Sequence, residues 1–385
     1  MSGRHAGPVV GVLPALGSGL TDLQRSGQEE RLLDYDLTHY ARAFAEVRYF
    51  SYFDERLETF TDDPALRARV RLHPKRLPVG RHLYALALPV AYRAALRGCA
   101  VLRVEQFTGV LPAVIARRLY GIPFVVTYGY DYDAVVRVAG SRVKPAYFAW
   151  LRRLALPRAA GVIVPNRDLG ALLRRRWPGL TLLELPNGVD PERFRPAPAP
   201  PGERAERVVV YVGRLSPEKN LLRLVDALAL VDAPPARLVL IGDGPEARAI
   251  GDRARSRRVR VELAGVVPNR ELPARLRDAD CFVLPSLTEG HPKALLEAMS
   301  AALPCVVSDR GGNRLLVDDG ESGVRFDPED VGAMAAGIRR VLLDRSLAAR
   351  LGAAARERVL ADYDLDRLLA AEVRFVLDVA RARGR

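Results

Sequence analysis

The chain has 385 residues, a length that predicts two domains rather than one hydrophobic core. Hydrophobic residues make up 49% of it, which excludes a disordered chain, and no apolar run reaches the roughly 20 residues of a membrane span. The net charge is +13, but neither zinc-finger spacing nor an aromatic ladder accompanies that charge. Nucleic acid is therefore not expected as a partner.

The compartment is predicted from the cysteines and the N-terminus. Cys99, Cys281 and Cys305 are far apart in the sequence, so they are expected to be small buried hydrophobic residues of a reducing compartment. The N-terminus turns directly into an expected strand, without the layout of a signal peptide. A cytoplasmic protein is the expectation.

Short β-branched runs recur along the chain, and each is followed by a helical pattern. In the first half they are residues 9–13, 47–52, 101–105, 124–128, 161–165 and 180–185. In the second half they are residues 208–212, 238–241, 259–263, 281–284, 305–308 and 323–326. Such alternation is typical of parallel strands buried on both faces. It predicts two doubly wound, Rossmann-like α/β domains, with ligands beyond the carboxyl ends of the strands.

Domain boundaries follow from a proline-rich stretch near the middle of the chain. Residues 186–206 contain prolines that continue neither a helix nor a central strand, so they are expected to form a linker. The N-terminal domain is then residues 1–185 and the C-terminal domain residues 207–364. Residues 365–385 alternate apolar and basic side chains at helical spacing, which predicts a final helix that packs back on the body.

Basic residues gather in the first half of the chain. They are Arg67, Arg69, Arg71, Lys75, Arg76, Arg81, Arg93 and Arg97. One interpretation is the solvated surface of an arginine-rich protein. The other is attraction to an anionic surface, either the inner membrane leaflet or a phosphorylated acceptor. The sequence leaves both open.

Two cations follow the first expected strand of the second half, where residues 212–220 read Val-Gly-Arg-Leu-Ser-Pro-Glu-Lys-Asn. Gly213 directly follows the strand, and its missing Cβ lets a phosphate approach the backbone. Arg214 can form two parallel hydrogen bonds to phosphate oxygens, and Lys219 adds a point charge. The stretch predicts a diphosphate site; a surface loop in which Glu218 pairs with one cation is the alternative.

Two carboxylates, Glu289 and Glu297, lie eight residues apart in the sequence Glu-Gly-His-Pro-Lys-Ala-Leu-Leu-Glu. Pro292 suits the first position of a helix, so a helix is expected from there through Ala302. Glu289 then lies in the preceding loop, and residues 290–294 present backbone N–H groups to an anion or a sugar oxygen. Together with the upstream cations, these carboxylates predict a site for a nucleotide sugar.

Two features near these motifs allow more than one interpretation. Lys293, Glu297 and Ser300 recur at helical spacing, as either the solvated face of the helix or part of the site. Gly311 and Gly312 permit either an anion-binding turn or a plain turn from strand to helix.

Taken together, the motifs resemble family 4 glycosyltransferases, which are retaining nucleotide-sugar enzymes of the GT-B fold. The matching segments are Pro-Asn-Gly-Val-Asp at 186–190, Gly-Arg-Leu to Glu-Lys-Asn at 213–220, Gly-Asp-Gly-Pro at 242–245, Leu-Ala-Gly-Val-Val at 263–267, the paired glutamates at 289–297 and Gly-Gly at 311–312. The resemblance implies two Rossmann-like domains facing across a cleft, with the acceptor held by the N-terminal domain and the donor by the C-terminal domain.

The resemblance also implies a role for each matching position. The implied catalytic residues are Arg214, Lys219 and Glu289. The implied donor-binding residues are Gly17, Gly19, Gly213, Val266, Gly290, His291, Pro292, Lys293, Ala294, Leu295 and Glu297. In that scheme the two cations hold the diphosphate, Glu289 and the following backbone hold the sugar, and Glu297 holds the ribose. Val266 would meet the nucleobase, and the loop with Gly17 would approach the diphosphate from the opposite domain.

Two positions depart from the family pattern. Members commonly carry His-Gly on the acceptor side where this chain has Tyr128 and Gly129, so the acceptor-side role passes to Tyr128 or Asp131. Leu315 stands where a glutamate is often found after the Gly-Gly pair. A shift in sugar or acceptor preference is expected from the second departure.

The implied reaction is a retaining transfer of a hexose-type sugar from a nucleoside-diphosphate sugar. No Asp-x-Asp accompanies the donor motifs, so neither a metal nor another cofactor is expected, and cations with helix amides would offset the leaving-group charge. The expected acceptor is a glycan or a lipid-linked molecule, such as a bacterial cell-surface polysaccharide intermediate, with peripheral contact at the inner membrane face. Two alternatives stay open: a GT-B sugar-nucleotide epimerase and a non-catalytic scaffold that binds sugar nucleotides.

Overall fold

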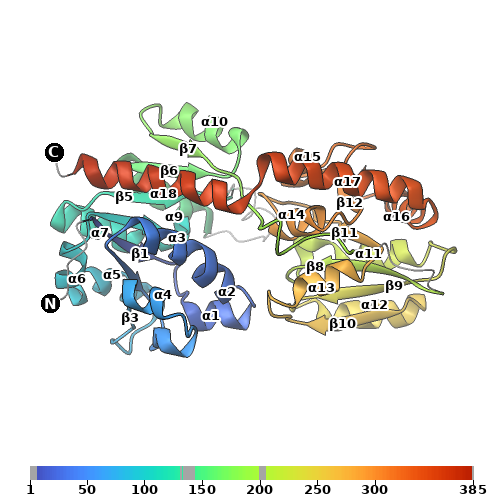
Figure 1. The fold of residues 1–385 in the computed structure, drawn as a ribbon, viewed down its shortest axis with the longest axis horizontal. Helices are drawn as coiled ribbons and strands as arrows, with labels where there is room; N and C mark the ends of the chain where they lie inside the picture. The colour runs from blue at the N-terminus through green and yellow to red at the C-terminus, as the bar shows by residue number, and fades with distance from the viewer. Residues whose placement is uncertain (1–6, 131, 133–143, 199–204, 384–385) are drawn as a thin grey trace. The chain divides into compact units, whose positions relative to one another are not determined.

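The computed structural model describes residues 7–130, 132, 144–198 and 205–383, and these form two compact units. The first unit comprises residues 1–186 and 367–385, and the second comprises residues 187–366 (Figure 1). Each unit is an all-parallel sheet flanked by helices, which confirms the predicted pair of Rossmann-like α/β domains.

The first unit contains a seven-stranded sheet in the order β3-β2-β1-β4-β5-β6-β7. Its strands are β1 (Val9–Leu13), β2 (Glu46–Phe50), β3 (Val70–His73), β4 (Val101–Val104), β5 (Phe124–Thr127), β6 (Gly161–Val164) and β7 (Leu182–Glu184). Its helices are α1 (Leu20–Arg25), α2 (Glu29–Arg31), α3 (Thr38–Ala43), α4 (Pro64–Arg69), α5 (Arg81–Ala91), α6 (Arg93–Arg97), α7 (Leu111–Tyr120), α9 (Lys144–Ala155) and α10 (Arg167–Arg176), followed far along the chain by α18 (Leu365–Ala382). Short π or 3₁₀ turns occur at η1 (Leu32–Leu37), η2 (Leu57–Thr59), η3 (Phe107–Gly109) and η4 (Leu156–Arg158).

The second unit contains a six-stranded sheet in the order β10-β9-β8-β11-β12-β13. Its strands are β8 (Arg207–Val212), β9 (Ala236–Ile241), β10 (Val261–Gly265), β11 (Cys281–Leu284), β12 (Cys305–Ser308) and β13 (Val324–Phe326). Its helices are α11 (Leu221–Leu228), α12 (Ala247–Arg257), α13 (Leu272–Arg277), α14 (Lys293–Ser300), α15 (Gly311–Leu316), α16 (Val331–Leu343) and α17 (Arg345–Asp362), with the 3₁₀ turn η5 (Pro217–Lys219) ahead of α11. The buried strands β11 and β12 are apolar except for Ser308 at the end of β12, as expected of parallel strands covered on both faces.

The structure adds one strand that the sequence analysis did not expect. Strand β3 lies at the edge of the first sheet and alternates apolar residues with Arg71 and His73, so its apolar run is too short to stand out. The strand lies within the cluster of basic residues noted in the sequence. Arg71 of that cluster is therefore an exposed residue of an edge strand. The structure also shortens the helix expected at 292–302, because Pro292 is the N-cap and α14 ends at Ser300.

The predicted linker belongs to the second unit, and the predicted C-terminal helix packs on the first unit. Val189 and Phe194 are buried in the core of the second unit, so the described part of residues 187–206 belongs to that unit. Helix α18 packs on the first unit, where Val373 and Val376 join the core beneath the sheet. Its buried Glu372 accepts hydrogen bonds from Arg103 Nε at 2.8 Å and Tyr40 Oη at 2.7 Å.

Candidate functional site

The second sheet brings the two principal motifs together. Strand β8 lies beside β11, and the strand order reverses between them. In open parallel sheets, ligands bind beyond the carboxyl ends of the strands at such a reversal. The loop that follows β8 carries Arg214 and Lys219, and the loop that follows β11 carries Glu289. Residues about 70 positions apart in the sequence are thus neighbours because of topology.

Backbone geometry fixes the loop after β8. Gly213 has a φ of 150°, and a Cβ at this position would lie 2.6 Å from the hydroxyl oxygen of Tyr211. That hydroxyl donates a hydrogen bond to the carbonyl oxygen of Arg214 at 3.0 Å. Asn220, which precedes α11 in the left-handed region, donates from Nδ2 to the carbonyl oxygens of Pro285 and Pro328 at 3.2 and 2.9 Å. The loop is therefore tied to the segment that follows β11.

Lys219 and Glu289 form an ion pair at the centre of the site. Lys219 Nζ lies 2.6 Å from Glu289 Oε1, and the two side chains are only 20% and 9% exposed. Ser286 Oγ donates a hydrogen bond to the same oxygen at 2.7 Å, which fixes the carboxylate. Glu218 instead accepts a hydrogen bond from Ser216 Oγ at 2.6 Å, so the alternative in which it pairs with Lys219 does not hold.

Arg214, in the same loop as Lys219, is exposed. Its side chain makes no ion pair with any residue that the structure describes, in contrast to Lys219. The loop after β8 therefore presents two cations at the carboxyl end of the strand, one of them solvent-facing. Such an arrangement suits an anionic group with several oxygens.

Gly311 and Gly312 hold the backbone of the Glu289 loop. A Cβ on Gly311 would lie 2.3 Å from the carbonyl oxygen of Glu289, and one on Gly312 would lie 2.2 Å from that of Gly290. The amide of Gly312 donates a hydrogen bond to the Glu289 carbonyl oxygen at 2.9 Å. Close approach of two backbones therefore explains this glycine pair, which serves as a turn into α15.

His291 contributes its backbone to this loop, while its ring belongs to the interior. The carbonyl oxygen accepts a hydrogen bond from Asn187 Nδ2 at 2.6 Å. The ring is 7% exposed, packs 5.4 Å from that of Tyr363 and has no hydrogen-bond partner at Nδ1 within the described part of the chain. Burial lowers the pKa of His291 from 6.5 to about 4, so the ring is neutral at pH 7.

Helix α14 begins directly after this loop. No side chain caps it at its N-cap residue, Pro292. The helix N-terminus, which includes Ala294 and Leu295, therefore directs its positive end toward the same edge of the sheet. Lys293 is exposed, whereas Glu297 is buried and Ser300 donates a hydrogen bond to the carbonyl oxygen of Phe194 at 2.9 Å. The stripe is thus not a solvated face.

The predicted site residues of the first unit lie in different surroundings. Gly17 has a φ of 84°, and a Cβ on Gly19 would lie 2.3 Å from Ser51 Oγ. The first amides of α1, on Leu20 and Thr21, donate to the buried carboxylate of Glu55 at 2.9 and 2.8 Å. An internal carboxylate therefore occupies this helix N-terminus.

Of the two predicted acceptor-side residues, Tyr128 and Asp131, the structure describes only Tyr128. The ring of Tyr128 is 2% exposed and packs against Phe107 and Tyr132, so it serves the core of the first unit and not an exposed surface. Asp131 lies outside the described residues. In the second unit, Val266 follows β10 and is 43% exposed, which leaves its side chain accessible to a ligand.

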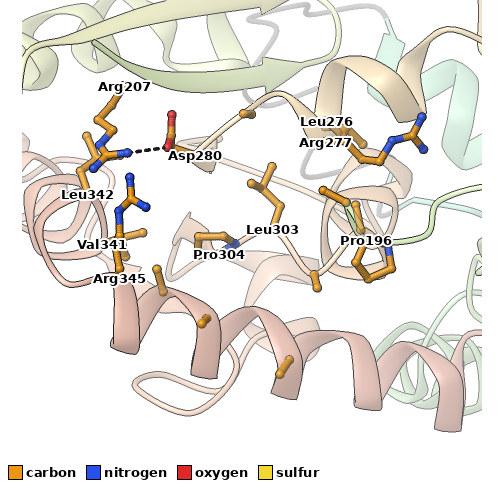
Figure 2. Close-up of a pocket in the computed structure, with 17 residues that line it drawn as sticks. Pro196, Arg207, Leu276, Arg277, Asp280, Leu303, Pro304, Val341, Leu342 and Arg345 are labelled. Atoms are coloured by element: carbon orange, nitrogen blue, oxygen red, sulfur yellow. Dashed lines mark hydrogen bonds and ion pairs between the residues drawn. The ribbon is translucent and has the colours of Figure 1, made fainter. Parts of the chain in front are cut away.

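A separate cavity of about 300 Å³ lies at the amino ends of the strands of the second sheet. Its lining includes Arg207 at the start of β8, Asp280 just before β11 and Pro304 just before β12 (Figure 2). Arg207 and Asp280 pair there at 3.2 Å. Because these residues mark the amino ends of the strands, the cavity is not part of the site around Lys219.

The described residues include neither a metal-binding cluster nor a membrane-spanning helix. They contain no group of three or more His, Cys, Asp or Glu side chains placed to hold a metal ion. No helix within the described ranges is long and apolar enough to cross a membrane.

Comparisons with known proteins agree with this geometry. Residues 36–188 match the model of the "Glycosyl transferase 4-like domain", and residues 196–358 match that of "Glycosyl transferases group 1". Glycogen synthase from Mycobacterium tuberculosis is 32% identical over 279 residues, which cover 70% of this chain and 66% of that protein. The chain belongs to the group 1, or family 4, glycosyltransferases.

Other relatives of this glycosyltransferase chain differ in their named substrates. UDP-Gal:alpha-D-GlcNAc-diphosphoundecaprenol alpha-1,3-galactosyltransferase from Escherichia coli is 32% identical over 260 residues, which cover 62% of this chain and 65% of that protein. The chain thus spans slightly less than two thirds of these curated relatives.

Solved structures confirm the GT-B fold. The chain superposes on sucrose-phosphate synthase from Thermosynechococcus elongatus with a TM-score of 0.78 at 21% identity, covering 97% of this chain and 100% of the other. It superposes on Anabaena HepE in complex with UDP-glucose with a TM-score of 0.77 at 18% identity, covering 96% and 99%.

The structure also shows two side chains that hold the Glu289 loop and that the sequence analysis did not single out. Ser286 fixes the Glu289 carboxylate, and Asn187 holds the carbonyl of His291. Asn187 lies within the matched Pro-Asn-Gly segment, which was a usable signal. Ser286 had none, since a serine after an apolar strand is common in any turn.

Proposed function

We propose that this chain is a retaining glycosyltransferase that moves a hexose-type sugar from a nucleoside-diphosphate sugar to a glycan or lipid-linked acceptor, without a metal ion. The observation that carries the proposal is the ion pair of Lys219 with Glu289, next to exposed Arg214 and the uncapped start of α14. A diphosphate placed there meets two cations and a helix N-terminus. The sugar hydroxyls meet a fixed carboxylate.

In the proposed reaction, the bond between the anomeric carbon and the diphosphate oxygen breaks while the acceptor oxygen bonds to the same carbon on the same face. The acceptor proton passes to the departing phosphate oxygen. Lys219 and Arg214 offset the charge that develops on the leaving group, and Glu289 orients the sugar. Lys219 must then turn from Glu289 toward phosphate or be shared between them when the donor binds.

Thermal stability in the presence of nucleotides tests the donor site. Relatives named for UDP-Gal and GDP-mannose make the base an open question, so the panel contains both nucleoside series with and without a chelator. A rise in melting temperature with one series, unchanged by chelation, supports a metal-independent donor site. Loss of the rise on chelation contradicts metal independence, and the absence of any rise contradicts the donor site.

Substitution of the cations tests their role in turnover. Lys219→Ala and Arg214→Ala should each lower the rate of nucleoside-diphosphate release about 10²–10³-fold, the usual cost of removing one transition-state donor. Arg248→Ala, an exposed arginine on α12, is the matched control. Near-normal rates in both site variants would overturn the phosphate assignment. Donor binding without release in the wild type would instead support the scaffold.

A further inference from the structure

From Leu83 to Ala91, helix α5 is apolar around its whole circumference, although it lies at the surface. Its inner side buries Tyr84 and Leu88 in the core of the first unit. On its outer side, Leu83, Leu86 and Val90 are 61%, 49% and 62% exposed. A helix that is apolar on every side is normally enclosed by protein or lipid. These three residues form a ridge one helical turn apart, hereafter the apolar ridge.

The ridge stands on a rigid base. Helix α7 packs beside α5 on the same face of the sheet, and Tyr120 Oη donates a hydrogen bond to the carbonyl oxygen of Pro89 at 2.9 Å. Figure 1 shows α5 and α6 following one another at one end of the first unit. Leu119, at the end of α7, is a further exposed apolar residue. Since the inner side of α5 is fixed in the core, exposure of the ridge is not a matter of fraying.

The sequence segment that carries the ridge has charged residues of one sign only. Residues 64–104 contain no Asp or Glu but the following basic residues: Arg67, Arg69, Arg71, Lys75, Arg76, Arg81, Arg93, Arg97 and Arg103. Arg103 is buried against Glu372, and Arg67 and Arg71 pair with acids from outside this segment. Arg81 begins α5, and Arg93 and Arg97 extend from α6, all exposed. The ridge is thus flanked by cations at both ends.

We propose that α5 and α6 form a membrane-docking surface, in which the apolar ridge enters the boundary between headgroups and acyl chains and the flanking arginines bind anionic headgroups. An apolar face combined with cations is what an interfacial helix requires. A free polyanion would use the arginines but leave the ridge exposed. A second copy of this chain would bring like charges together. This surface does not depend on the proposed transfer reaction.

Vesicle binding by the full chain, without any substrate, tests the proposal. The protein is sedimented with vesicles of phosphatidylcholine alone or mixed with phosphatidylglycerol. It should bind the anionic vesicles and not the neutral ones. Absence of binding to both kinds would overturn the proposal. Because no sugar nucleotide is present, failure here is distinct from failure of the donor site.

Two sets of variants separate the apolar and charged parts. Leu83→Gln, Leu86→Gln and Val90→Gln combined should lower vesicle binding at least about tenfold. Arg81→Gln with Arg93→Gln should lower it about fivefold for each charge removed. The matched controls are Leu230→Gln, Leu343→Gln and Leu360→Gln combined, which are equally exposed elsewhere, and Arg175→Gln with Arg248→Gln. Both control sets should bind as the wild type does.

An inserted probe distinguishes penetration from adsorption. Leu86→Trp places an indole on the exposed ridge, where its emission should shift to shorter wavelength on anionic vesicles and be quenched by brominated acyl chains. An unshifted spectrum, or full binding by the ridge variant, would leave only a charge-driven polyanion contact and overturn the membrane assignment. Loss of self-association in the ridge variant without any change in vesicle binding would likewise overturn it, in favour of a second copy.

Discussion

Each unit carries a glycine-containing loop ahead of a helix, with Gly17 and Gly19 before α1 and Gly290 before α14, yet the N-termini of these two helices differ. In the first unit, the amides that begin α1 donate to Glu55, a carboxylate from the same unit. In the second unit, the carboxylate of Glu289 binds Lys219 and Ser286, and no side chain caps α14. The N-terminus of α1 is thus occupied by a carboxylate of the protein, and we call it the sealed start. The N-terminus of α14, at the carboxyl ends of the strands, has no such carboxylate, and we call it the open start.

This difference shows that a glycine-rich loop before a helix does not by itself indicate an anion site. The positive end of a helix is satisfied equally well by a protein carboxylate or by a ligand phosphate. What distinguishes the second unit is the accompanying exposed cation, Arg214, and a glutamate engaged by lysine and not by helix amides. Sealed and open starts should therefore respond differently to substitution.

Displacing the backbone of the loop ahead of α14 should have the largest effect, and the effect should be on turnover. In Gly312→Ala the new Cβ overlaps the carbonyl oxygen of Gly290, so the Glu289 loop must move. Turnover should fall about 10²-fold, because misplacement of a positioning group by about 1 Å has that effect. Gly251→Ala, where the Cβ meets no atom closer than 3.7 Å, is the control and should keep full turnover. Normal kinetics in Gly312→Ala would show that the loop position does not matter.

Removal of the Glu55 carboxylate should lower the stability of the fold and leave the affinity for the donor unchanged. Glu55→Ala leaves two amides at the start of α1 without their acceptor and frees the hydroxyl of Thr21, so the free energy of unfolding should fall by about 3 kcal/mol. Chemical denaturation measures this loss, with Glu58→Ala, an exposed neighbour, as the control. Donor affinity of the folded protein should not change. An increase in affinity would mean that Glu55 blocks a second anion site beside Gly17 and Gly19.

The sequence predicted the double Rossmann-like fold well because apolar strands and turn residues are local signals. It could not predict that Glu55 reaches the start of α1, since nothing at position 55 marks a partner 35 residues earlier. It also missed β3, whose edge position allows Arg71 and His73 to alternate with apolar residues. Lys219 and Glu289 were predicted as members of one site, but their direct pairing depends on the adjacency of β8 and β11. The roles of these residues in binding and catalysis stay predictions.

The smallest expected effect concerns His291, whose backbone belongs to the open site and whose ring belongs to the core. Burial holds its pKa near 4 in the folded chain against 6.5 when exposed. Below pH 6.5 the unfolded chain therefore takes up a proton that the folded chain does not, and stability falls as the pH is lowered toward 4. Between pH 7 and pH 5 the loss should be about 2 kcal/mol.

His291→Phe should remove that part of the pH dependence, while turnover at pH 7 stays normal, because the ring is buried and only the backbone of this residue, held by Asn187, belongs to the Glu289 loop. Denaturation at pH 7 and pH 5 measures the difference from the wild type. The pKa of His73 is also lowered to about 4, by burial and by Arg48, but it contributes equally to both proteins. His82→Gln, at an exposed position, is the control for replacing a histidine as such. If His291→Phe folds normally yet loses turnover, the imidazole must contact the donor. The assignment of the ring to the interior and of only the backbone to the site would then be wrong.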